Sequence, residues 1–166
     1  MRIRVVPVPF IAVAVLAFGS VALAWVLQHQ FGYAPCPWCT FQRLLYLLIG
    51  ALALLAAGVH RRGTLAIALG ASVPLLALGG VLAAWHQHTV AAQSDSCALT
   101  LADRVLGALN LPDLLPTMFE ATARCDEANV PWLGVPFALW SLALFCILAL
   151  LSLRAFRLRP HTLFLK

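Results

Sequence analysis

The chain has 166 residues, of which 63% are hydrophobic and 10% are charged, and its formal net charge is +5. With a mean hydropathy of +0.93, it has too little polar surface to cover a water-soluble globule of this length, which excludes an ordinary soluble domain. The composition predicts a membrane protein, and we interpret the positive charge as a signal of membrane topology, with no nucleic-acid partner.

Four apolar runs approach the roughly 20 residues that a helix needs to cross the hydrocarbon core of a bilayer. They predict an all-α membrane protein, a four-transmembrane-helix bundle that forms a single domain over residues 1–166. The predicted spans cover residues 5–27, 41–59, 65–85 and 133–153, and the loops on the outer side cover 28–40 and 86–132.

The first span has an alternative interpretation. Its basic start and the stretch Ala22-Leu23-Ala24 are also features of a secretory signal with a small-residue cleavage site. The apolar run exceeds the roughly 7–15 residues that are usual in such signals, so we expect a retained membrane span. Cleavage would leave the sidedness of the remaining loops unchanged.

A C-x-x-C pair, Cys36 and Cys39, lies at the outer start of the second span. Pro37 favours a helix that begins here, because proline is tolerated where helix amides lack an acceptor. The positive N-terminal end of a helix stabilises a thiolate, and Arg43 lies one turn after Cys39 on the same helix face. A nearby cation lowers the pKa of a thiol, and a guanidinium can hold a polar ligand. The segment therefore predicts thiol–disulfide exchange.

The long loop between the third and fourth spans holds Cys97, Cys125 and two apolar segments. The first segment has helical spacing and predicts a short amphipathic helix after Cys97, and the second contains two prolines. Their apolar residues are Leu99, Ala102, Val105, Leu106 and Leu109, then Leu111, Leu114, Leu115, Met118 and Phe119. These segments suit the lipid–water interface, but packing onto the bundle explains the periodicity equally well.

Charge predicts the orientation of the four spans. If the spans alternate, eight basic residues fall on one side, and all six acidic residues fall on the other side with the loop cysteines. The eight basic residues are Arg2, Arg4, Arg61, Arg62, Arg154, Arg157, Arg159 and Lys166. By the positive-inside rule, both termini are cytoplasmic and the cysteine-bearing loops face outward.

Spacing alone leaves the roles of the cysteines open. Cys97 and Cys125 form either a redox pair or a structural disulfide that staples the loop. Cys36 and Cys39 are either a redox pair or half of a zinc site, whose remaining ligands would lack a second close ligand spacing. Those remaining ligands would come from Cys97, Cys125, His86 and His88; we predict no metal. Cys146, in the middle of the fourth span, is predicted to be a small buried apolar residue.

The ordered set of these features resembles one known family. The set comprises four spans, the C-x-x-C followed by Arg43, the loop cysteine pair, and the stretch Trp132-Leu133-Gly134-Val135-Pro136 with Trp140 at the fourth span. The chain resembles the disulfide bond formation protein B (DsbB) family, the quinone-dependent inner-membrane oxidases that recharge the periplasmic thioredoxin-fold oxidase DsbA. The resemblance covers nearly the whole chain, and it implies that the long loop is periplasmic.

The resemblance implies a two-stage relay at the outer face of the bacterial inner membrane. A DsbA-like partner would form a transient mixed disulfide with Cys97, and Cys125 would pass reducing equivalents to Cys36. Cys39 would then transfer electrons to a quinone, either ubiquinone or menaquinone, held beside Arg43. Thiolate attack moves two electrons between the pairs, and the quinone supplies the terminal redox chemistry.

Two positions depart from the family pattern. Some members carry an acid where this chain has Gln42, so a proton-handling role of that acid does not transfer. A histidine near the outer end of the third span is a family feature, and here both His86 and His88 fit it. His86 is slightly preferred because it directly follows Trp85 at the end of the apolar run. Near a quinone carbonyl, a histidine would donate a hydrogen bond or a proton, whereas the alternative is a solvated interfacial histidine.

Two other functions share parts of this pattern. A vitamin K epoxide reductase-like protein is also a four-helix, quinone-linked thiol oxidoreductase, but that family has its C-x-x-C at the start of the last helix, and this chain has none there. A non-catalytic tetraspan scaffold with stapled loops would not need Cys36 and Cys39 at a thiolate-favouring helix start, nor Arg43 beside them.

Overall fold

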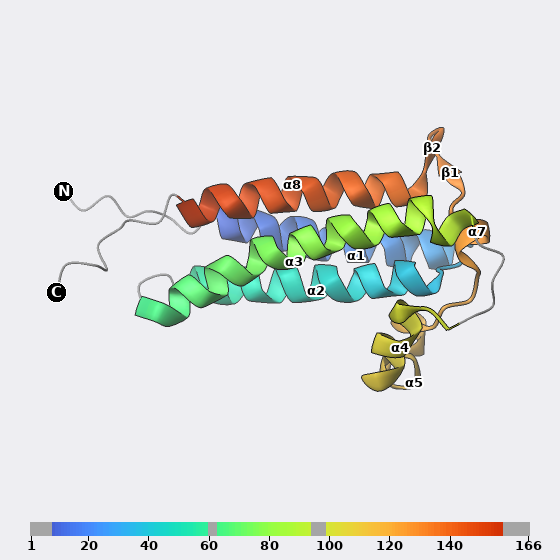
Figure 1. Cartoon of the computed structure of the whole chain (residues 1–166), viewed down its shortest axis with the longest axis horizontal. Coiled ribbons are helices and arrows are strands. Elements are labelled where there is room, and N and C mark those ends of the chain that lie inside the picture. The colour runs from blue at the N-terminus through green and yellow to red at the C-terminus, as the bar shows by residue number, and fades with distance from the viewer. Residues whose placement is uncertain (1–7, 60–62, 94–98, 158–166) are drawn as a thin grey trace.

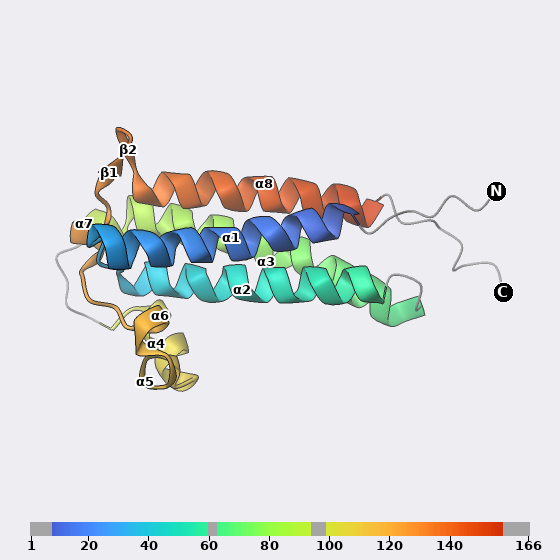
Figure 2. The same ribbon diagram turned by 180° about the vertical axis from the view of Figure 1, so that it is seen from behind.

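The computed structural model describes residues 8–59, 63–93 and 99–157 of the chain. Four long helices run side by side as a bundle, and a group of short elements lies at one end of it (Figure 1, Figure 2). Each long helix has the length and apolar character needed to cross a membrane. The helices are α1 (Val8–Phe31), α2 (Pro37–Gly58), α3 (Gly63–Thr89) and α8 (Phe137–Arg157). The predicted all-α, four-helix membrane fold is confirmed.

The start of α2 is set by capping. Cys36 is the N-cap residue with an extended backbone, and its sulfur accepts a hydrogen bond from the Cys39 amide at 3.3 Å. Pro37 occupies the first turn, where its missing amide hydrogen leaves no bond unmade. The helix therefore includes the C-x-x-C spacing in its first turn and begins ahead of the 41–59 range that hydropathy indicated.

The start of α8 is set by a tight hairpin. Leu133 and Gly134 have positive φ angles of 54° and 81°, and they form the turn between β1 (Pro131–Trp132) and β2 (Val135–Pro136). The two strands are antiparallel, and Trp132 pairs with Val135. Because this turn interrupts the apolar run, α8 begins only at Phe137.

Close helix packing depends on small residues at the contacts, as expected where helices associate within a membrane. A Cβ atom at Gly80 in α3 would overlap the ring of Phe145 in α8, and one at Gly50 in α2 would meet the ring of Phe18 in α1. The Phe145 ring stacks on Tyr46 of α2, with centroids 4.1 Å apart and an interplanar angle of 4°. These contacts join all four long helices in the membrane-spanning part of the bundle.

The long loop between α3 and α8 contains short helices. They are η1 (Ala91–Gln93), α4 (Leu101–Ala108), α5 (Leu111–Leu114), α6 (Pro116–Phe119) and α7 (Cys125–Ala128). α4 begins with a capping box in which Thr100 and Asp103 satisfy each other's amides. Ala102 and Leu106 are buried, whereas several leucines of the same segment are exposed: Leu99, Leu101 and Leu109. Placement of this segment at a lipid–water interface stays a prediction.

The fourth-span cysteine differs from its expected position. Cys146 is exposed on α8, whereas its neighbour Phe145 is fully buried. The apolar sequence around it gave no signal of which face would meet the bundle, because lipid-facing and core-facing positions are equally apolar in a membrane helix. The prediction of a buried Cys146 is wrong.

Candidate functional site

Cys36 and Cys39 face each other at the first turn of α2. Their sulfurs lie 2.7 Å apart and are hydrogen-bonded. Cys36 is fully buried and Cys39 is half-buried, and both are free thiols. The amide of Cys39, in the first turn of the helix, donates to the Cys36 sulfur, and the positive end of the helix favours a thiolate in this pair.

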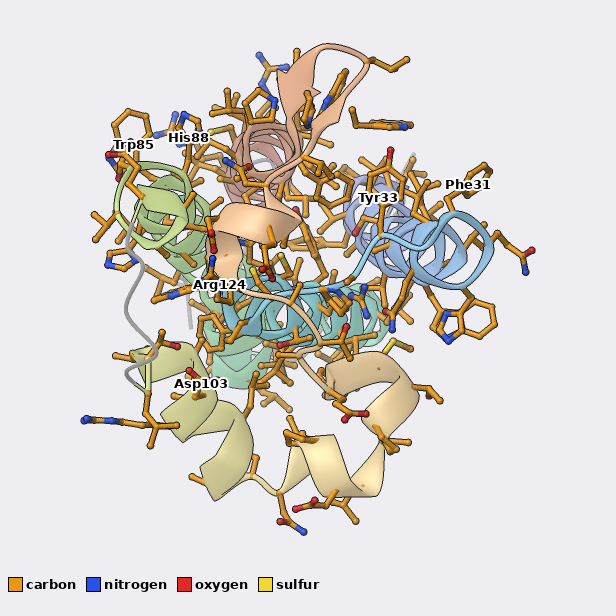
Figure 3. The ribbon with its side chains drawn as sticks, turned by 90° about the vertical axis from the view of Figure 1, so that its right-hand side faces the viewer. Phe31, Tyr33, Trp85, His88, Asp103 and Arg124 are labelled. Atoms are coloured by element: carbon orange, nitrogen blue, oxygen red, sulfur yellow. The ribbon has the colours of Figure 1, made fainter. Side chains whose placement is uncertain are left out.

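Cys125 reaches the same place from the far end of the chain. The amides of Thr122 and Ala123 both donate to the carbonyl of Pro35, at 2.9 and 3.2 Å, and so fix the loop against the residue that precedes Cys36. The Cys125 thiol is hydrogen-bonded to the Cys36 thiol and to the backbone of Trp38. Figure 3 views the molecule from the end where these segments meet.

The structure therefore brings together three of the four predicted redox cysteines. Cys36, Cys39 and Cys125 form one cluster, which we call the thiol cluster. Cys97, the fourth, lies outside the described residues, so its pairing with Cys125 stays a prediction.

Two of the thiols have opposite acidities. Burial raises the pKa of the Cys36 thiol well above its usual range, and the hydrogen bonds with Cys125 and Cys39 raise it further. The hydrogen bond from Cys36 lowers the pKa of the Cys125 thiol, against the opposing effect of burial. Of these two, Cys125 is thus the better thiolate, and Cys36 holds its proton.

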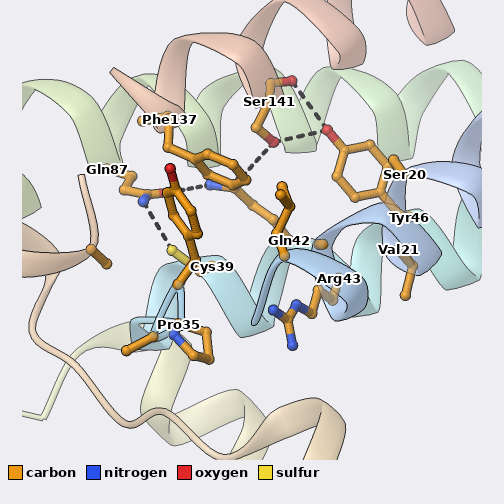
Figure 4. A pocket seen from close by; sticks show the side chains of 16 residues that line it. Ser20, Val21, Pro35, Cys39, Gln42, Arg43, Tyr46, Gln87, Phe137 and Ser141 are labelled. Carbon is orange, nitrogen blue, oxygen red and sulfur yellow. Dashed lines mark hydrogen bonds between the residues drawn. The ribbon is translucent and has the colours of Figure 1, made fainter. Parts of the chain in front are cut away.

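A cavity adjoins Cys39 on the bundle side, where α1, α2, α3 and α8 approach one another (Figure 4). Its lining combines apolar side chains with a few polar ones that point inward. The polar side chains of the lining are Ser20, Tyr33, Gln42, Arg43, Tyr46, Gln87 and Ser141. A small number of placed polar groups in an apolar pocket is typical of a ligand site.

Arg43 is the charged residue of this cavity lining, and its side chain is buried. Its Nη1 donates to the Gln28 amide oxygen at 2.7 Å and to the Met118 carbonyl at 3.0 Å. Both acceptors are neutral, and within the described ranges no carboxylate forms an ion pair with Arg43. A buried guanidinium with unneutralised charge is suited to hold an electronegative oxygen of a ligand.

A chain of hydrogen bonds runs along the cavity wall from Cys39 to Tyr46. Gln87 of α3 donates to Cys39, Gln42 of α2 donates to Gln87, and Ser141 of α8 bonds both Gln42 and Tyr46 (Figure 4). Gln87 is not among the site residues predicted from the sequence, although it lies between the two predicted histidines. The available signal was an amide within a predicted membrane helix, because buried polar groups there are costly and tend to be functional.

The two predicted histidines lie in the last turn of α3 and do not line the cavity. His86 is exposed, and its ring contacts Trp38 with centroids 4.7 Å apart. His88 is half-buried, and its Nδ1 atom has no hydrogen-bond partner among the residues that the structure describes. A role for either histidine in binding a quinone stays a prediction.

The family model and the known proteins that match this chain carry the same family name. The family model described as "Disulfide bond formation protein DsbB" matches residues 7–155. Proteins named "Disulfide bond formation protein B" are similar along most of their length. The one from Ralstonia nicotianae is 38% identical over 142 residues, which are 85% of this chain and 87% of that protein. The one from Herminiimonas arsenicoxydans is 32% identical over 154 residues, 91% of this chain and 95% of that protein.

A third relative, from Aromatoleum aromaticum, is 34% identical over 149 residues, which cover 87% of this chain and 88% of that protein. The family resemblance predicted from the residues is confirmed by these matches. The molecule has four apolar helices long enough to cross a membrane, and free thiols cluster at one end of the bundle. The chain belongs to the disulfide bond formation protein B family of disulfide-forming, multi-pass membrane oxidoreductases.

Proposed function

We propose that this protein is a thiol:quinone oxidoreductase of the bacterial inner membrane that reoxidises a DsbA-like, thioredoxin-fold dithiol oxidase in the periplasm. The observation that carries the proposal is the contact between the thiols of Cys125 and Cys36. It joins the long loop, where a soluble partner can dock, to the helix that borders the cavity.

Electrons enter through the loop pair. A thiolate of the reduced partner attacks Cys97 of a Cys97–Cys125 disulfide, which forms a mixed disulfide and releases Cys125 as a thiolate. The second partner thiol then attacks its own sulfur in the mixed disulfide, so that the partner leaves oxidised and Cys97 leaves reduced.

Exchange between the pairs is carried by Cys125. Its thiolate attacks Cys36 of a Cys36–Cys39 disulfide, so that a Cys125–Cys36 bond forms and the electron pair of the broken bond stays on Cys39. The contact between Cys125 and Cys36 supports this step, because the attacking and attacked sulfurs are already neighbours. A structural staple in the loop would not require Cys125 to lie against α2.

The residues beside Cys39 fit a quinone. Arg43 offers a buried guanidinium with neutral partners to a carbonyl oxygen, and Cys39 borders the same cavity. An apolar groove beside α1 and α2 shares Val21 with the cavity and suits an isoprenoid tail. It is lined by Phe18, Val21, Ala22, Trp25, Val26, Leu47 and Met118. A bound quinone would accept the two electrons and two protons that the thiols give up. His86 or His88 would act from the rim.

The proposed orientation places the thiol cluster outside and both termini in the cytoplasm. Arg154 and Arg157 lie in the last turn of α8, at the end of the bundle remote from the cysteines. The short helices at the cysteine end carry acidic residues, namely Asp103, Asp113, Asp126 and Glu127. This asymmetry supports the positive-inside orientation.

Turnover by the purified protein tests the proposal. The full chain in detergent is mixed with an excess of a reduced thioredoxin-fold dithiol protein and a soluble quinone, and quinone reduction is followed by absorbance. We expect many turnovers per protein, which Cys36→Ser or Cys125→Ser abolishes. A non-catalytic scaffold would show no quinone reduction above the uncatalysed rate, and that result would refute the proposal.

A further inference from the structure

Five polar side chains form an unbroken path through the largely apolar interior, and they come from three different helices. α2 contributes Cys39, Gln42 and Tyr46, α3 contributes Gln87, and α8 contributes Ser141. Gln87 and Gln42 are almost completely buried, with exposed fractions of 1% and 4%. Uncharged amides at this depth are costly unless every polar atom is paired, so their pairing needs an explanation.

The path has one direction, which follows from the donor capacity of each group. Tyr46 has a single hydroxyl hydrogen, which faces the Ser141 hydroxyl at 2.8 Å and its carbonyl at 3.1 Å. The Ser141 hydroxyl donates to the Gln42 amide oxygen at 2.6 Å. The Gln42 amide nitrogen therefore points to the Gln87 oxygen, at 2.5 Å.

The end of the path is an N–H group aimed at sulfur. Because its oxygen is held by Gln42, the Gln87 side chain presents its NH₂ group to the thiol cluster, 3.2 Å from the Cys39 sulfur and 3.5 Å from the Cys36 sulfur. A thiolate has no proton to give and only accepts hydrogen bonds. The direction of the path thus matches an ionised Cys39.

We propose that Gln87 is a catalytic residue that stabilises the Cys39 thiolate released when Cys125 opens the Cys36–Cys39 disulfide, and that Gln42 and Ser141 are positioning residues that fix its amide. The inference rests on the proposed function for the identity of that step. In the step, the electron pair of the Cys36–Cys39 bond stays on the Cys39 sulfur, where negative charge develops next to the Gln87 N–H.

The physical basis is preorganisation. A donor that is already oriented toward the atom where charge develops needs no reorganisation during the reaction, and its effect is large where water is excluded. Bonds in a chain also polarise one another, so that the distant Ser141 hydroxyl strengthens the donor at Gln87. Arg43 supplies a full charge on the same side of α2, whereas Gln87 supplies a neutral and directional contact from α3.

The test uses the full-length protein with Cys39 as its sole cysteine. Cys36→Ser keeps a good N-cap, and serine also replaces the cysteines at 97, 125 and 146. The readouts are the rate of iodoacetamide alkylation at pH 7 and the thiolate absorbance at 240 nm that alkylation removes. Gln87→Met has a similar length and no donor. We expect it to lower both readouts by roughly ten- to a hundredfold, the usual effect of one hydrogen bond to a charged group.

A matched serine pair tests the path when Gln87→Met is poorly folded. Ser141→Ala removes the hydroxyl that orients Gln42, and we expect a drop of roughly two- to fivefold in both readouts. Ser152→Ala is the control, because Ser152 is a buried serine of the same helix that donates to the Ala149 carbonyl one turn away. It should leave both readouts unchanged.

Two outcomes would overturn the inference. One is a folded Gln87→Met variant that reacts as fast as its parent. The other is an equal loss in Ser141→Ala and Ser152→Ala, which would reflect general loosening of α8. Neither measurement needs a partner protein or a quinone. If the native protein failed to reduce quinone while Gln87→Met still lost thiolate, the proposed function would fail and the role of Gln87 as a thiolate donor would stand.

Discussion

Replacing Arg43 tests how the protein holds an oxidant. In the structure, one guanidinium nitrogen bonds both Gln28 of α1 and the carbonyl of Met118 in the loop, and the group has no charged partner within the described part of the chain. Arg43→Ala removes the positive charge from the cavity wall and leaves these two acceptors without their donor. We expect weaker binding of the quinone, with the first exchange at Cys97 preserved.

The size of the effect follows from the kind of bond that is lost. A hydrogen bond to a charged group contributes about 1.5–3 kcal/mol, and every 1.4 kcal/mol is a factor of ten in binding. The apparent KM for quinone should therefore rise roughly ten- to a hundredfold in Arg43→Ala. Arg43→Lys should recover part of the loss, because an ammonium keeps the charge without the planar array of donors.

The assay is steady-state quinone reduction at saturating reduced partner, together with a single-turnover measurement of partner oxidation without quinone. Gln28→Leu is the control: it removes one acceptor of Arg43 and retains the guanidinium, so its quinone KM should change much less. An Arg43→Ala protein with normal quinone kinetics would refute the assigned role. A loss of the single turnover would instead show that Arg43 mainly fixes the loop through Met118.

Three further predictions concern the cysteines. A Cys125→Ser protein whose Cys97 thiol is oxidised, by an added thiol oxidant, onto a partner that lacks its own resolving cysteine should accumulate as a reductant-sensitive complex on a denaturing gel, whereas Cys97→Ser should give little of it. Trapping mainly at Cys36 would contradict the relay. In the fully reduced protein, iodoacetamide should alkylate Cys125 faster than Cys36 at pH 7, because a lowered pKa leaves more of a thiol as thiolate. Mass spectrometry of the labelled peptides gives the ratio of the two rates. Cys36→Ala should slow the labelling of Cys125, because it removes the hydrogen bond that lowers the pKa of Cys125. Cys146→Ala should retain near-normal quinone turnover, because Cys146 is exposed and remote from the thiol cluster; loss of turnover in a folded variant would make Cys146 a redox residue.

The start of α2 could be predicted from the sequence because all its determinants are local. Pro37 marks the first turn, and Cys36 caps it. Once the helix begins there, its period brings Cys39 and Arg43 to one side. Hydropathy found the four long helices for a similar reason, since each run is continuous along the chain.

The rest of the site depends on contacts between distant segments. Hydrogen bonds from the backbone amides of Thr122 and Ala123 to the Pro35 carbonyl hold Cys125 against the start of α2. Backbone amides are common to almost all residues, so these bonds leave no pattern in a sequence. The contact of Gln87 with Cys39 depends on how α3 is rotated and shifted against α2, which a single sequence does not encode in its hydropathy. The start of α8 was missed because a turn at Leu133 and Gly134 interrupts residues that are as apolar as a helix.

The position of Cys36 lets the relay proceed with small movements of side chains. Its thiol contacts the Cys39 thiol within α2 and the Cys125 thiol in the loop, so one buried sulfur is the neighbour of both cysteines with which it could form a disulfide. To change its disulfide bond from Cys39 to Cys125, Cys36 then needs only side-chain rotation, because hydrogen bonds to the Pro35 carbonyl keep the loop in place. Because burial keeps Cys36 protonated whenever it is released, it does not compete with Cys125 as a nucleophile. Electrons would therefore pass through Cys36 toward Cys39, where Gln87 and Arg43 favour the negative charge.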